Sequence, residues 1–391
     1  MARTYKTRMK KRKRQNRNKR LLIFAFLLIC GLIYIAFPET PYNQQEKHLQ
    51  ATEKQTKPEK KENQHPDQKE EKQSRIITKD DNAQLDEYLK SIEFSGTALI
   101  VDEGKIVTSK GYSYANRKQK EPNTPDTVFY VGSSQKAIIA AAILQLEEKG
   151  QLSVNDPVST YLPDFPNGSN ITLYHLLTHT SGIRGHKEGN GYISPKDLIQ
   201  DIKEQGIKNG PGKWDYKDSN YSVLAYIVST ISGEPVDQYV TEHVFKPAGM
   251  KHAGFYKTFA KQAHQSKGYK LNALKKLYTP DIPDLSQLYG AGDIYMTAYD
   301  MYLFDKALYE RKIISDESFT KMFTPNKATY GMGFYVSPGS YSSHGVMPGY
   351  NILNSFSLTG SRYVILFSNI QNNIKSFGKV NNRIYSILNA Y

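Results

Sequence analysis

The chain of 391 residues is long enough for one large domain or two ordinary ones, and its formal net charge is +14. Eleven Lys or Arg and no acidic residue fall in residues 1–20, which leaves a charge of +3 for the other 371 residues. Because the excess is confined to one end, the composition argues against a nucleic-acid-binding protein, and a single cysteine, Cys30, excludes a disulfide framework.

The first predicted element is a membrane anchor. Residues 21–37 are seventeen uncharged, largely apolar residues, at the short end of what spans a bilayer. The basic segment 1–20 before them predicts a cytoplasmic N-terminus and an exported remainder. A cleaved signal peptide is the alternative, but no small-x-small cleavage site surrounds Ala36, and the large residues before Cys30 argue against lipoprotein processing. An exported domain without cysteine needs no disulfides. We therefore expect a protein anchored in the cell membrane with its domain outside the cell, as in a Gram-positive bacterium.

Residues 38–81 change in composition to Lys, Glu, Gln and Pro, with almost no large apolar residue. Such a segment cannot bury a core, so it is predicted to be a disordered extracellular linker. The globular domain is therefore expected over residues 82–391, held some distance above the membrane.

The globular part has β-rich ends and a largely helical middle, with no regular βαβ alternation and no internal repeat. This pattern predicts an α+β fold, in which an antiparallel sheet built from both ends of the chain is flanked by helices and carries a helical subdomain. In chain order, we expect a helix at 85–92, a hairpin at 96–111, a strand at 127–131, helices at 137–148, 172–179 and 219–232, strands at 330–337 and 363–369, and a closing helix at 380–388.

Ser133 lies where the strand at 127–131 meets the alanine-rich helix at 137–148. At the start of a helix its backbone N–H is unpaired and can face an anion. Lys136 follows three residues later, so the two side chains share a helix face. A lysine held in an apolar pocket can lose its proton and act as a base toward that hydroxyl. The pair predicts an acyl-transfer nucleophile, whereas Ser134 has no lysine three residues on.

The same spacing recurs at Ser318 and Lys321. There Ser315, Asp316 and Glu317 are typical of the capped start of a surface helix. We therefore expect a structural role for this second pair.

Two later segments carry further candidates. Residues 213–221 deliver Tyr216 and Asp218, which can enter one cleft; the alternative, a turn with a surface tyrosine and a helix cap, is strong in a chain with 29 tyrosines. Residues 342–350 are rich in small residues, which at a strand edge let a substrate backbone pair and a free N–H bind an oxyanion. A Gly-rich hairpin connection is the alternative there.

His175 and His179 are four residues apart, which could suggest a metal pair. Neither an H-E-x-x-H pattern nor a further ligand cluster accompanies them, so we expect a structural role and neither a metal nor another cofactor. The chain has no G-x-S-x-G elbow, Walker loop or dinucleotide fingerprint.

Taken together and in this order, the segments around residues 133, 216 and 344 resemble the serine β-lactamase and penicillin-binding-protein family, most closely its class-C-like branch of D-alanyl esterases and D-aminopeptidases. Segments 176–183, 248–250 and 290–297 match that branch too. The resemblance covers roughly residue 95 to the C-terminus. It implies a β-lactamase/transpeptidase-like fold and a covalent acyl-serine intermediate.

The resemblance also implies roles. Ser133 is the nucleophile, Lys136 its proton acceptor, and Tyr216 the relay of the proton to the leaving group. Asp218 stands where most relatives have Asn.

The third segment aligns in two ways with the family's Lys/His-x-Gly. Counting back from 348–349 matches Ser343, His344 and Gly345, whereas counting from the histidine matches His344, Gly345 and Val346. The first is preferred, because it keeps Gly345 where a side chain would block the substrate. The Val346 N–H would then be the second oxyanion donor, beside that of Ser133.

Both departures from the family pattern bear on the substrate. Asp218 near Lys136 would favour the charged ammonium and leave more of the proton transfer to Tyr216. Ser343 in place of a basic residue weakens the grip on the carboxylate that β-lactams and D-Ala-D-Ala peptides present. A D-alanyl ester on a polyol phosphate polymer presents an ammonium group instead, for which Asp218 is a plausible partner.

The Tyr-x-Asp variant also resembles the staphylococcal type of membrane-anchored teichoic acid D-alanyl esterase. We therefore expect a D-alanyl esterase or transferase acting on teichoic acids of the cell wall, with weak β-lactam acylation. One alternative is a D,D-carboxypeptidase or low-affinity penicillin-binding protein acting on peptidoglycan peptides, and another is a non-catalytic wall-binding module. The acyl acceptor and the oligomeric state are left open.

Overall fold

The computed structural model describes residues 82–390. The anchor expected at 21–37 and the linker expected at 38–81 lie outside the described residues. Over the residues described, no helix combines the length and the apolar character needed to cross a membrane.

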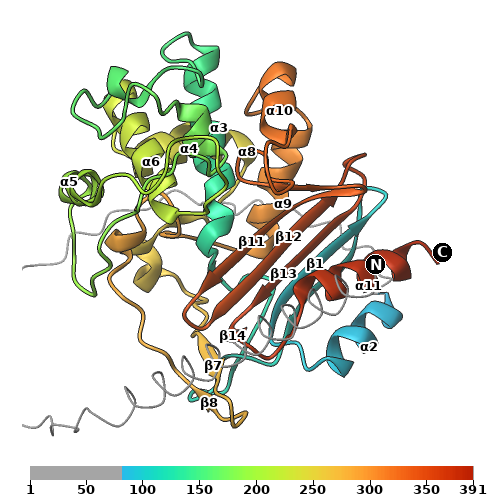
Figure 1. Ribbon diagram of the computed structural model, residues 1–391. Coiled ribbons are helices and arrows are strands. Elements are labelled where there is room, and N and C mark those ends of the chain that lie inside the picture. The colour runs from blue at the N-terminus through green and yellow to red at the C-terminus, as the bar shows by residue number, and fades with distance from the viewer. Residues whose placement is uncertain (1–81, 391) are drawn as a thin grey trace, which may run out of the picture. The chain divides into compact units, whose positions relative to one another are not determined.

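A six-stranded antiparallel sheet, in the order β10-β11-β12-β13-β1-β2, lies between two groups of helices (Figure 1). As predicted, it combines two strands from the N-terminal end of the domain with four from the C-terminal end. The main strands are β1 (Gly96–Asp102), β2 (Lys105–Tyr112), β10 (Tyr335–Ser337), β11 (Ser340–Met347), β12 (Tyr350–Ser357) and β13 (Tyr363–Ser368). Short strands elsewhere are β3 (Tyr114–Asn116), β4 (Glu121–Pro122), β5 (Phe129–Tyr130), β6 (Gly254–Phe255), β7 (Tyr269–Leu271), β8 (Leu277–Tyr278), β9 (Ile294–Met296) and β14 (Ile370–Gln371).

Helices flank the sheet and build the middle of the chain (Figure 1). The α-helices are α2 (Ala83–Ser91), α3 (Lys136–Glu148), α4 (Leu173–Leu177), α5 (Pro195–Gln205), α6 (Asp218–Ser232), α7 (Val236–Val240), α8 (Lys246–Ala248), α9 (Ala298–Tyr309), α10 (Asp316–Phe323) and α11 (Phe377–Leu388). Short 3₁₀ helices are η1 (Gly132–Gln135), η2 (Val158–Thr160), η4 (Tyr256–Lys261) and η5 (Leu285–Leu288), and η3 (Thr241–Phe245) is a π-helix.

Alternate residues of β1 enter two different cores, because successive side chains of a strand point to opposite faces. Ala98 and Ile100 pack with α2 and α11, which lie together on one face of the sheet (Figure 1). Leu99 and Val101 join the larger core formed with α3 and α9 on the other face. Since both faces are covered, β1 is buried from Gly96 to Val101 rather than at alternate residues only.

α3 is the central helix of the helical part, and every residue from Lys136 to Leu146 is buried. α6 packs directly on it. The two helices begin at the same place, so the first turn of α6 lies beside the first turn of α3. This arrangement brings the segment 213–221 next to the turn that carries Ser133.

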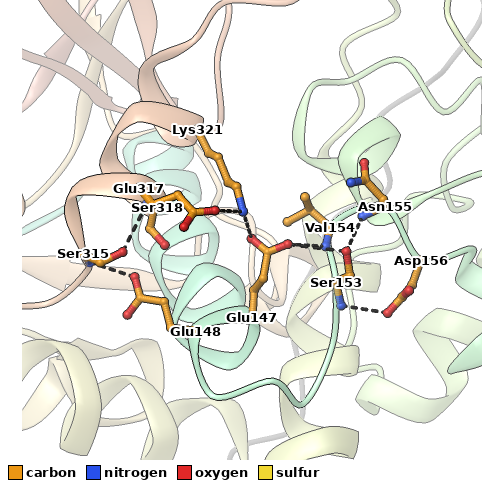
Figure 2. Close-up of polar contacts among 10 residues, drawn as sticks. All are labelled: Glu147, Glu148, Ser153, Val154, Asn155, Asp156, Ser315, Glu317, Ser318 and Lys321. Carbon is orange, nitrogen blue, oxygen red and sulfur yellow. Dashed lines mark hydrogen bonds and ion pairs between the residues drawn. The ribbon is translucent and has the colours of Figure 1, made fainter.

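The far end of α3 is tied to α10 (Figure 2). Lys321 pairs with Glu147 at 3.1 Å, and the Ser315 N–H donates to Glu148 Oε1 at 2.7 Å. Ser315 Oγ caps α10 by accepting from the Ser318 N–H. The second Ser-x-x-Lys pair therefore has the structural role predicted for it.

Two predicted strands are shorter in the structure. Tyr330 bridges both Lys327 and Tyr335, which marks a tight fold-back, so the strand expected at 330–337 is confined to β10. The strand expected at 127–131 is reduced to β5, which pairs with β9 rather than with the main sheet. Segment 342–350 is mostly strand β11 and includes the turn at 348–349 that joins it to its antiparallel partner β12, a strand that was not predicted.

Candidate active site

Ser133 lies on η1, the turn between β5 and α3. The other three residues of this turn are buried, whereas Ser133 is half-buried and so accessible. Gly132 has a φ of 51°, a left-handed conformation that glycine adopts without strain. The turn therefore presents the Ser133 hydroxyl from an otherwise closed core, one turn ahead of the α-helix rather than within it.

Lys136 is completely buried directly behind this hydroxyl. Its Nζ lies 2.9 Å from Ser133 Oγ, 3.0 Å from the Ala291 carbonyl oxygen and 2.8 Å from Asp218 Oδ1. An ammonium group has three N–H donors, and here three acceptors surround it. The predicted Ser133–Lys136 contact is present, and Ala291 is a partner that the sequence analysis missed.

The charge on Lys136 differs from the expectation of an uncharged base. Burial lowers the pKa of Lys136, but the Tyr216 phenol and the Asp218 carboxylate outweigh it, so the pKa lies above its ordinary value. The resting group is therefore an ammonium. This is the effect foreseen for a carboxylate at position 218.

Asp218 is the first residue of α6, where a helix N-terminus favours a negative charge. Although it pairs with a fully buried lysine, its side chain is 42% exposed. One carboxylate oxygen is thus committed to Lys136 while the side chain also borders open space.

Tyr216 approaches the same centre from the segment before α6. Its ring centroid lies 5.2 Å from Lys136 Nζ and 4.0 Å from the ring centroid of His179, with the two planes 31° apart. Trp214 and Tyr330 complete an aromatic cluster around the imidazole. The predicted proximity of Tyr216 to the Ser133–Lys136 pair is present.

His179 is the packing partner that fixes this segment. It is completely buried, and its Nδ1 accepts from the Lys217 N–H at 3.3 Å and lies 3.0 Å from Asn220 Nδ2. Burial and the charge on Lys136 hold the pKa of His179 well below its usual range, so the ring is neutral. A structural role was expected for this histidine. In the structure it packs against Tyr216 and so holds the tyrosine ring beside Lys136.

Strand β11 carries the third predicted segment and presents it on two opposite faces. Ser343 is buried on the face toward α9, where Asn354 Nδ2 lies 3.4 Å from its Oγ. His344 points to the other face: its Nε2 lies 2.6 Å from Asn351 Oδ1, and its ring lies near Phe377 of α11. This corrects the grouping of His344 with the site, because adjacent strand residues cannot face the same side.

Gly345 has a different reason for being glycine than the one expected. A Cβ there would lie 1.9 Å from the Val131 carbonyl oxygen, so a side chain would collide with the turn before Ser133 rather than block a substrate. The next residue, Val346, approaches the turn as well: its N lies 3.1 Å from where a Cβ on Gly132 would be. The Val346 backbone therefore borders the Ser133 turn, as the oxyanion assignment requires.

No group of three or more His, Cys, Asp or Glu within residues 82–390 is placed to hold a metal ion. A fully buried lysine in contact with a half-buried serine at a helix start, beside an antiparallel sheet edge, is typical of an active-site serine protein of the β-lactamase/transpeptidase type.

Comparison with known proteins gives the family. A family model described as Beta-lactamase matches residues 82–389, and the chain belongs to this family. It is 59% identical over 386 residues, 98% of both chains, to the Bacillus subtilis (strain 168) protein PbpX, whose naming as a penicillin-binding protein is itself provisional.

Two staphylococcal matches are more distant. The chain is 33% identical over 266 residues, 65% of both chains, to a teichoic acid D-alanine hydrolase of Staphylococcus aureus (strain MRSA252). The crystal structure of FmtA from Staphylococcus aureus superposes with a TM-score of 0.72 at 29% identity, over 78% of this chain and 86% of that one. The chain is thus a penicillin-binding-protein-like serine hydrolase.

Proposed function

We propose that this protein removes or transfers D-alanyl groups esterified to teichoic acids, through an acyl intermediate on Ser133. The name of the staphylococcal hydrolase supports this substrate class. The basic segment 1–20 and the apolar segment 21–37 support a membrane anchor with the catalytic domain outside the cell, within reach of such polymers.

The observation that carries the proposal is the environment of Asp218. A D-alanyl ester presents an ammonium group near its carbonyl, and Asp218 offers a partly exposed carboxylate within the same cluster as Ser133. The position from which relatives hold a substrate carboxylate is occupied by Ser343, which is neutral and buried. The charges of the site thus match a cationic acyl group better than an anionic one.

Acylation starts at Ser133, and the neighbouring side chains transfer its proton and stabilise the charges that develop. Ser133 Oγ attacks the ester carbonyl and forms the O–C bond, while its proton passes to the polyol oxygen through Tyr216 as the C–O bond of the ester breaks. The Ser133 and Val346 N–H groups stabilise the oxyanion, and the Lys136 ammonium stabilises the developing serine alkoxide. Water or another hydroxyl then attacks the acyl-serine and receives the D-alanyl group.

The test compares two substrates with one enzyme. We expect purified full-length protein to release D-alanine from D-alanylated teichoic acid at least tenfold faster, in kcat/KM, than from a peptide ending in D-Ala-D-Ala. Ser133→Ala is the control and should abolish release. Faster release from the peptide would contradict the proposal.

The second candidate function is a D,D-carboxypeptidase or low-affinity penicillin-binding protein, which the name of the Bacillus subtilis relative favours. The same comparison decides between the two. A non-catalytic wall-binding module is tested separately, by stoichiometric labelling with a fluorophosphonate or penicillin probe: labelling that is lost in Ser133→Ala rules this module out.

A further inference from the structure

A cavity of about 270 Å³ lies on the helical side of the domain, between α6, α7, η4 and η5. Ser133, Lys136, Tyr216 and Asp218 are not among its lining residues. The walls are aromatic, with Tyr226, Tyr256, Tyr289 and Phe255 among the side chains that line it. It is therefore a space separate from the catalytic cleft.

The cavity and the catalytic centre share one stretch of chain, residues 289–293. Tyr289 and Asp293 line the cavity. Between them, the Ala291 carbonyl accepts from Lys136 Nζ at 3.0 Å on the side of the active site. Movement of residues 289–293 at the cavity would therefore also move the Ala291 carbonyl that accepts from Lys136.

Asp293 makes a second connection. Its Oδ1 accepts from Gln135 Nε2 at 2.6 Å and from the Gly290 N–H at 3.1 Å, and Gln135 Oε1 accepts from the Ile294 N–H at 2.9 Å. Gln135 is the last residue of η1, the turn that carries the nucleophile. The cavity wall is thus hydrogen-bonded to the turn that presents Ser133.

The lining also indicates which ligand fits. Asp293 is 3% exposed and Asp237 is a second carboxyl of the lining, whereas the cation Lys257 is exposed. Burial, with a smaller contribution from Asp237, raises the pKa of Asp293 to about 7. Tyrosine faces attract cations, and a carboxyl in an apolar site is stabilised by an ammonium partner. An apolar body ending in an ammonium group matches both features.

We propose that this cavity is a second ligand site for a small organic ammonium, and that its occupancy changes the reactivity of Ser133 through residues 289–293. The proposal does not depend on which acyl group Ser133 takes.

Binding is tested by calorimetry on the full chain, with phenethylammonium and with uncharged phenethyl alcohol as probes. We expect the ammonium to bind at least tenfold more tightly than the alcohol, and Asp237→Asn to weaken it several-fold. Asp281→Asn, an exposed acid outside the lining, is the matched control. Absence of binding, or equal affinity for the alcohol, would overturn the proposal.

Two further measurements locate the ligand and test the coupling. Protein already labelled at Ser133 by a fluorophosphonate should still bind phenethylammonium; loss of binding would place the probe in the catalytic cleft and refute the second site. Saturating phenethylammonium should change the labelling rate of Ser133 at least threefold in the wild type and not in Asp237→Asn. An unchanged rate, with binding demonstrated, would overturn the coupling.

Discussion

Asp218 is the residue that sets the charge of the active site, because it supplies a carboxylate 2.8 Å from Lys136. Asp218→Asn should lower the pKa of Lys136, and because the ammonium is the stabilising form, the alkaline, falling limb of the pH profile of Ser133 acylation should move to lower pH. The same change removes the proposed partner of the substrate ammonium. We therefore expect kcat/KM for D-alanyl ester hydrolysis to fall at least tenfold while labelling by a penicillin probe is kept or increased.

Ser133→Ala serves as the control for this experiment and should abolish both reactions. If Asp218→Asn lowered ester hydrolysis and penicillin labelling equally, Asp218 would act on the nucleophile alone and not on the choice of substrate.

Asp293 makes the stability of the fold depend on pH. Its pKa rises from 3.8 to about 7 through burial. A carboxyl with a raised pKa in the folded state binds its proton more tightly there, so its stabilising contribution is complete below pH 3.8 and is lost as the pH rises through 7. The difference amounts to roughly 4 kcal/mol in the free energy of unfolding.

Asp293→Asn keeps an oxygen acceptor for Gln135 but cannot ionise. Its unfolding temperature should therefore fall less between pH 5 and 8 than that of the wild type, on the order of several degrees less. Asp281→Asn should follow the wild type. Identical pH slopes for Asp293→Asn and the wild type would show that Asp293 does not titrate in this range.

The chemistry of single positions could be predicted where the residues are close in sequence. Ser133 and Lys136 share a helical turn, and Tyr216 and Asp218 share one segment, so each pair was recognisable. The Ala291 carbonyl carries no side-chain signal, and the orientation of His344 depends on which face of β11 is buried. Only the fold determines these two.

At the scale of elements, the approach of β11 to η1 is required for the site, and Gly345 permits it. Gly345→Ala would place a methyl group 1.9 Å from the Val131 oxygen and force the strand away from the turn. We expect a loss of about 1–3 kcal/mol in stability and a slower labelling of Ser133. Gly339→Ala, at the turn into β11 where nothing lies within 4 Å, is the matched control and should leave both unchanged.

The two Ser-x-x-Lys pairs, one at the start of α3 and one within α10, allow the effects of removing each lysine to be compared within one chain. Lys321→Ala removes ion pairs of a side chain that is 36% exposed and should cost at most about 1 kcal/mol, with Ser133 labelling unchanged. Lys136→Ala should abolish labelling. Loss of labelling in Lys321→Ala would mean that the tie between α3 and α10 positions the active site.

Element boundaries were predictable where local signals and burial agree. The hairpin of β1 and β2 and the helix α6, which ends at Gly233, match their predicted ranges closely. The strand expected at 330–337 is limited to its last residues because the chain folds back at Tyr330, close to Gly333 with its φ of 88°. Segment 342–350 was ambiguous since its small residues suit a turn as well as a strand that packs closely on η1.

At the scale of the whole molecule, the site is assembled from segments far apart in the sequence. Ser133 comes from η1, Lys136 from the start of α3, Asp218 from α6, Ala291 from the stretch before β9 and Val346 from the sheet. The order of the motifs was enough to predict an α+β fold of this family. By contrast, only the folded structure reveals that residues 289–293 border both the cavity and Lys136.

In the proposed reaction, Ser133 carries the acyl group of a D-alanyl ester. This step is tested most directly by intact-protein and peptide mass spectrometry after brief incubation with D-alanylated teichoic acid and rapid acid quenching. We expect a mass increase of one alanyl residue, located on the peptide that contains Ser133 and absent from Ser133→Ala. An unmodified Ser133 in protein that is releasing D-alanine, or an adduct on another residue, would contradict it.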